Sequence, residues 1–340
     1  MTKPNIFLGI IFLGAIFWTS CNENKLPDVS HIKPHNSYFD FTVAFQQLDS
    51  NNYLERINTY KKSYPNFIMG FPAFVMEENI SNDTAVAEFF YEKYKYEKGF
   101  QMINDSVVKH QFDFKKIETE LDETFKFYQY YMEQDSAPNV FFYSSSFYSR
   151  NPFFGNSIGV SLEFYLGKNI PYYPIQFAQY QIRRFSPEYI APDLIHALAF
   201  YDLEEVYSDN RFLDQMISEG KVMYLSKLSL PKTQDSIIWG YTSSQMKWCT
   251  DNESQMWEHL VSPKINILYS TDFNTNIRYF EDAPFTNANQ VPPESAPRFA
   301  AWVGYKIIEK YMANNPHLSV KEMLFTKNAD EILKGSKYKP

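Results

Sequence analysis

The chain has 340 residues, and its 40 aspartates and glutamates outnumber its 32 lysines and arginines, which gives a formal net charge of -8. This acidic balance makes the chain a poor electrostatic candidate for binding nucleic acid or anionic lipid headgroups, and we expect no nucleic-acid partner. The length allows one large core or two subdomains around a shared cleft.

The N-terminus predicts a lipoprotein signal peptide over residues 1–20. Its apolar run, 6–18, is shorter than the roughly 20 residues that a membrane-spanning helix needs, and one lysine precedes it. The run ends in Thr19-Ser20-Cys21, which resembles a bacterial lipoprotein processing box. That resemblance implies lipid on Cys21 and an envelope protein that faces the periplasm, with the choice of membrane left open. Trp18 departs from the usual aliphatic residue, so a plain secretory signal is the alternative.

A polar tether and a helical segment are expected next. Residues 21–37 have two prolines and no apolar period, which is typical of an extended tether. Residues 38–135 are predicted to form a helical N-terminal subdomain. Its clearest helix lies within 114–132, where apolar residues recur at steps of three and four: Phe114, Ile117, Leu121, Phe125, Tyr128 and Met132.

The period changes to two at the start of the predicted C-terminal subdomain, 136–340. Apolar residues alternate over 158–166, which predicts a half-buried strand, and 139–148 is a plausible partner strand. Helical patterns dominate from there to the C-terminus. The expected fold class is therefore α+β and mostly helical, with a small β-sheet followed by helices.

Two C-terminal helices have clear signals. Residues 242–260 open with a capping box, Thr242 and Gln245, and place Glu253 inside an apolar stripe. A buried carboxylate needs a partner, so we expect Glu253 to pair with a residue such as arginine, with a role as a site acid as the alternative. A further helix is predicted between Pro297 and Pro316.

The stretch APDLIHALAF, 191–200, resembles the H-E-x-x-H helix of zinc peptidases whose third ligand is a glutamate. In that alignment Pro192 replaces the first histidine, Asp193 the general base, and His196 and Glu219 keep ligand types. The resemblance implies a degenerate zinc-peptidase-like (zincin) scaffold. Since proline offers no donor and two ligands are too few for tight zinc binding, we expect no metal, no cofactor and no catalytic residues. The structural alternative for His196 is a helix imidazole that a neighbour satisfies.

The C-terminal half also resembles a second family. LGKNIPYYP, FSPEYIAPDLI, MISEGKVMYL, GYTSSQMKWCTDNESQMWEHLV and WVGYKIIEKYM are together similar to the gliding-motility lipoprotein family GldB of Bacteroidetes. The resemblance covers most of residues 167–340 and agrees with the lipoprotein signal. It implies an envelope lipoprotein needed for gliding and linked to the type IX secretion apparatus, whose partners are other gliding and secretion proteins.

Three functions follow from these patterns. The first is a membrane-anchored, non-enzymatic interaction protein on a degenerate peptidase scaffold. The alternatives are a divergent active hydrolase and a glycan- or peptidoglycan-binding lipoprotein. The resemblance to Bacteroidetes envelope proteins also implies O-glycosylation at Asp-Ser/Thr motifs on exposed connections, and the candidate positions are Thr84, Ser106, Ser136 and Ser236.

Overall fold

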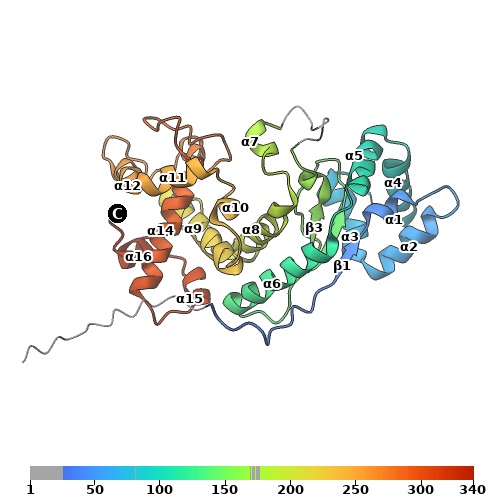
Figure 1. The fold of residues 1–340 in the computed structure, drawn as a ribbon, viewed down its shortest axis with the longest axis horizontal. Coiled ribbons are helices and arrows are strands. Elements are labelled where there is room, and N and C mark those ends of the chain that lie inside the picture. The colour runs from blue at the N-terminus through green and yellow to red at the C-terminus, as the bar shows by residue number, and fades with distance from the viewer. Residues whose placement is uncertain (1–25, 81, 169, 171–172, 174–176) are drawn as a thin grey trace, which may run out of the picture.

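The computed structural model describes residues 26–80, 82–168, 170, 173 and 177–340. The N-terminal helices gather at one end of an elongated molecule and the C-terminal helices at the other, with a small sheet and helix α8 between them (Figure 1). The chain is mostly helical with a parallel sheet, which confirms the expected α+β class. No helix among the described residues is long and apolar enough to cross a membrane.

The sheet has three parallel strands in the order β1-β2-β3. They are β1 (Tyr38–Asp40), β2 (Asn139–Tyr143) and β3 (Ser157–Ser161). The predicted pairing of the 139–148 segment with the 158–166 segment is confirmed, since Val140 pairs with Ile158. Strand β1 was not predicted, and it places the first residues of the predicted helical subdomain in the same sheet as β2.

Both faces of this sheet are covered, because alternate side chains of β2 enter two different cores. Val140 and Phe142 belong to the larger core, and Phe141 and Tyr143 belong to the smaller one. Five helical segments build the smaller core: α1 (Thr42–Gln46), α2 (Tyr53–Ser63), α3 (Pro65–Gly70), the π-helical turn η1 (Phe71–Val75) and α4 (Asp83–Lys95). Helix α5 (Lys98–His110) follows them and contributes to both cores.

The predicted half-buried strand over 158–166 is wrong in two respects. Strand β3 ends at Ser161, and every residue in it is buried. A methyl group on Gly159 would come within 2.7 Å of the Tyr143 ring, so the second face of β3 is filled by that ring rather than by solvent. A 3-10 turn, η2 (Leu162–Tyr165), follows the strand and buries Glu163.

Long helices build the larger core. Helix α6 (Phe114–Met132) buries the predicted stripe, and α8 (Ile190–Asp202), α9 (Phe212–Ser229) and α14 (Phe299–Asn314) pack beyond it. Gly220 and Gly304 face each other where α9 and α14 cross, and a methyl group on either would overlap the main chain of the other helix. The glycine after Glu219 therefore serves helix packing.

Shorter helices complete the C-terminal end. The predicted 242–260 helix is broken at Asn252, whose side chain donates to the Trp248 carbonyl oxygen at 2.8 Å. Its capping box is confirmed. The short helices are α7 (Gln179–Ile182), α10 (Asp235–Trp239), α11 (Ser243–Asp251), α12 (Glu253–Val261), α13 (Phe273–Asn276), α15 (Val320–Leu324) and α16 (Ala329–Ser336). The 3-10 turns are η3 (Pro187–Tyr189), η4 (Glu204–Val206) and η5 (Ile277–Tyr279).

Candidate functional site

A cavity of about 210 Å³ lies at the first turns of α8. Pro192, Asp193 and His196 all line it, so the structure brings together three of the residues that the sequence singled out. The other walls come from the segment before β3, from the residues after α7, from the end of α10 and from the residue before α14. Pro192 fits the first turn because the amide hydrogen that it lacks has no partner there in any helix.

Asp193 is held by an ion-pair network. Arg150 Nη1 donates to its Oδ2 at 2.8 Å, and Arg184 Nη2 lies 3.9 Å from its Oδ1. The Tyr165 hydroxyl also donates to Oδ2, at 3.2 Å. These contacts hold the carboxylate in place and occupy the oxygen that a general base would turn toward a water molecule. Asp193 is therefore poorly suited to act as a general base.

His196 lies one turn further along α8 without a full set of partners. Burial lowers the pKa of its imidazole, Glu219 opposes that shift electrostatically, and Arg298 adds to it. Its Nε2 atom is buried and has no hydrogen-bond partner among the described residues. The expectation that a neighbour satisfies this imidazole is therefore wrong for Nε2.

Glu219 does not line the cavity, and its Oε1 accepts a hydrogen bond of 2.7 Å from the Tyr207 hydroxyl. The donor set does not fit zinc, since Pro192 supplies no lone pair and the arginines at the cavity repel a cation. Within the described ranges, no group of three His, Cys, Asp or Glu side chains could hold a metal ion.

A family model described as gliding motility protein GldB, a lipoprotein family, matches residues 22–340. The chain belongs to the GldB family. No curated protein and no solved structure matches the chain. The likeness of this GldB-family chain to zinc peptidases therefore stays a prediction, while its link to gliding motility and its association with the cell envelope follow from the family.

The sequence interpretation missed the arginines of the site. The GldB-family chain has seven arginines, and four of them, Arg150, Arg183, Arg184 and Arg298, line the cavity or bond to its wall. Arg183 donates to the Gly240 carbonyl oxygen at 2.6 Å. The sequence did offer a signal: arginine is much rarer than lysine in this chain, so each arginine is a candidate for a specific role. Guanidinium groups are preferred over ammonium groups where a planar anion is bound.

Glu163, which the sequence interpretation also missed, fixes the loop that carries Arg150. Its Oε1 accepts hydrogen bonds of 2.8 Å from the Ser145 amide, the Ser145 hydroxyl and the Phe147 amide. Burial raises the pKa of this carboxyl. Ser146 and Phe147 have positive φ angles of 56° and 67°, which is uncommon for residues other than glycine. The buried acceptor stabilises this turn.

Glu253 lies elsewhere, in a groove of about 940 Å³ between α9, α14 and the C-terminus. The expectation of a buried carboxylate paired with arginine is wrong. Glu253 is half-buried because the break at Asn252 turns it out of the apolar stripe, and it accepts a hydrogen bond of 2.9 Å from the Tyr338 hydroxyl.

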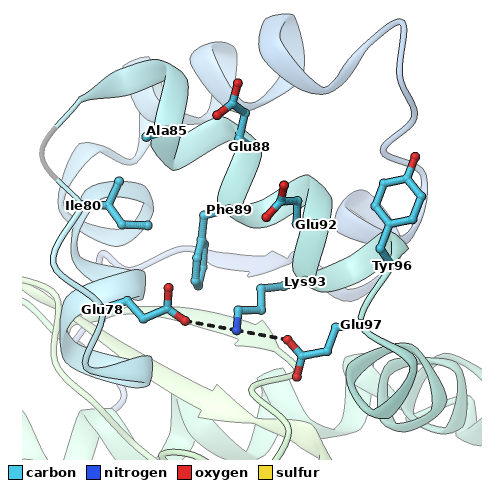
Figure 2. A pocket seen from close by; sticks show the side chains of 9 residues that line it. All are labelled: Glu78, Ile80, Ala85, Glu88, Phe89, Glu92, Lys93, Tyr96 and Glu97. Atoms are coloured by element: carbon cyan, nitrogen blue, oxygen red, sulfur yellow. Dashed lines mark ion pairs between the residues drawn. The ribbon is translucent and has the colours of Figure 1, made fainter.

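A second charged pocket lies on the N-terminal helices, beside α4 (Figure 2). Glu78, Glu88, Glu92 and Glu97 line it together with Lys93. Figure 2 shows the Lys93 ammonium between Glu78 and Glu97, and each ion pair measures 3.0 Å. Lys93, the cation of this acidic pocket, is thus paired with two of its glutamates, which points to a structural role.

The modification candidates differ in setting. Cys21 lies outside the described residues. Ser136 is in an exposed connection, as expected, whereas Thr84 and Ser236 lie in the first turns of α4 and α10 and Ser106 lies inside α5. The expected loop setting is wrong for these three, because the Asp-Ser/Thr pairs begin or continue helices. Glycan occupancy itself stays a prediction.

Proposed function

We propose that this GldB-family chain is a non-enzymatic interaction component of gliding motility and of the type IX secretion apparatus. It is tethered through lipid on Cys21 and faces the periplasm, where it contacts other gliding and secretion proteins. Membership of a gliding-motility lipoprotein family supports this proposal.

The state of Asp193 is the observation that carries the non-enzymatic part. In a peptidase the acid at this position activates water, which needs a carboxylate free to take a proton. Here Arg150 and Tyr165 donate to the same oxygen, at 2.8 and 3.2 Å. This arrangement favours a binding site over a hydrolytic centre.

Complementation in a gliding strain that lacks the gene tests this proposal. Glu219→Gln removes a carboxylate that a zinc peptidase would need as a ligand, and Glu219 does not line the cavity, so cells that make this variant should glide at the wild-type rate if the chain only binds. Glu88→Gln is a matched control, since that side chain is exposed on α4. Normal amounts of folded Glu219→Gln protein in cells that do not glide would contradict the non-enzymatic assignment.

The anchor and the partners need separate measurements. Cys21→Ser should release the chain from membranes or block its processing, as membrane fractionation would reveal. Crosslinking in the native envelope should recover gliding or secretion proteins with the wild-type chain. Recovery of peptidoglycan alone would favour the glycan-binding alternative instead.

A further inference from the structure

We propose that the cavity at the start of α8 binds the carboxylate of a small ligand, such as the last residue of a peptide. The proposal rests on the proposed function in one respect, namely that the cavity binds its ligand without transforming it. Three guanidinium groups, from Arg150, Arg184 and Arg298, line a space of about 210 Å³. Guanidinium groups match planar oxyanions because their donors form a rigid fork.

Among the three arginines that line the cavity, the ion pairs leave one without a carboxylate partner. Arg150 is committed to Asp193 at 2.8 Å, and Arg184 is shared between Asp193 at 3.9 Å and Asp282 at 3.2 Å. Arg298 has no carboxylate partner in the described part of the chain, and one of its nitrogens donates to the Trp239 carbonyl oxygen. A bound ligand with one negative charge would therefore neutralise the unpaired guanidinium group of Arg298.

Hydrogen-bond donors at the cavity are also left over. The Nε atoms of Arg184 and Arg298 are buried without a hydrogen-bond partner among the described residues. A buried donor without an acceptor is costly and rare in folded proteins. A carboxylate offers about four acceptor sites and no donor, which complements such a set.

The size and walls of the cavity restrict the ligand. Its volume of about 210 Å³ holds roughly seven water molecules, at about 30 Å³ each. Pro192, Ala197 and Ile238 add apolar surface beside the arginines. These dimensions suit a carboxylate on a short aliphatic stem, and they exclude most of a longer chain.

Isothermal titration calorimetry on the full lipidated chain in detergent tests the proposal. The probe is N-acetyl-alanine, and N-acetyl-alanine amide is its uncharged match. We expect saturable binding of the acid and none of the amide. Acetate should bind more weakly than N-acetyl-alanine, because it lacks the stem that contacts the apolar wall. Equal affinity for acetate would assign the site to a bare carboxylate and overturn the terminal-residue part of the proposal.

Variants locate the binding. Arg298→Gln should weaken N-acetyl-alanine binding by about 10- to 100-fold, the loss expected for a hydrogen bond to a charged group. Arg298→Lys should give an intermediate loss, since it keeps the charge without the fork. Arg56→Gln on α2 is the matched control and should bind normally, because Arg56 does not line the cavity.

Three results would overturn the proposal. They are no saturable binding of the acid by the wild-type chain, equal binding of acid and amide, and tighter binding of inorganic phosphate than of N-acetyl-alanine. None of them depends on the folding of a variant. Recovery of the bound probe unchanged, measured on the same samples, tests the proposed function separately, because a hydrolase would release acetate and alanine.

Discussion

The cavity at α8 and the acidic pocket at α4 both contain ion pairs, but in different surroundings. The side chains of Arg150 and Asp193 are 26% and 14% exposed, whereas the glutamates that flank Lys93 are 44% and 47% exposed. Water screens charges strongly at the acidic pocket, while the less exposed charges at the cavity depend more on their protein partners. Both regions are clusters of charges, but only at the cavity is a partly buried charge, that of Arg298, left without a carboxylate partner among the described residues. That unpaired charge is what favours the cavity as a binding site.

The largest effect should come from breaking the buried pair. We expect Asp193→Asn to lower the free energy of unfolding by about 3 to 5 kcal/mol, because it leaves Arg150 as an uncompensated cation. Asp282→Asn is the matched control, and it should cost about 1 kcal/mol or less, since that side chain is 38% exposed. Urea unfolding followed by circular dichroism measures both, and equal losses would show that burial does not separate these two carboxylates.

The pH dependence of stability sharpens the same comparison. Burial lowers the pKa of His196 from its ordinary 6.5. The folded chain therefore binds fewer protons than the unfolded chain between the two pKa values, so this contribution is present above pH of about 6.5 and is lost as the pH falls through the folded value. The pKa values of His110 and His259 are also lowered by burial, so the measure is the difference from a variant.

His196→Asn should therefore lose less stability than the wild type as the pH falls from about 7 to about 5. Glu163→Gln serves as the control of opposite sign, because burial raises the pKa of Glu163 and its contribution declines as the pH rises above about 4.5. Thermal unfolding at each pH supplies the curves. If the stability of His196→Asn changes with pH in parallel with that of the wild type, His196 does not contribute to the pH dependence.

The smallest effect belongs to the acidic pocket. Lys93→Ala removes the ammonium between Glu78 and Glu97, and we expect a loss of less than about 1 kcal/mol in the free energy of unfolding. The difference from the wild type should shrink further in 1 M salt, where screening shortens the range of exposed charges. A loss as large as that of Asp193→Asn would break the comparison.

Local patterns predicted a good part of this fold. The stripe from Ile117 to Met132 lies on one helix, the Thr242 and Gln245 capping box begins another, and β2 pairs with β3. Each of these depends on residues close together in the sequence or on one alternating segment. Local patterns did not predict that the smaller core covers the second face of the sheet. That face depends on Tyr143 of β2 packing against Gly159 of the neighbouring strand β3.

The candidate site was half predictable. The α8 frame supplied Pro192, Asp193 and His196, because their spacing matches a known helix pattern. Arg150 and Arg298 approach α8 from segments far away in the sequence, so no local period connects them to Asp193. Their meeting depends on tertiary packing, which a single sequence does not display.

Elemental analysis of the full chain, purified without chelator from its native envelope, tests most directly whether the α8 frame is a guanidinium-lined binding site rather than a zinc centre. The account predicts far less than one zinc per chain, because Pro192 supplies no donor and Arg150, Arg184 and Arg298 line the same space. About one zinc per chain in the wild type, lost in His196→Ala, would contradict it.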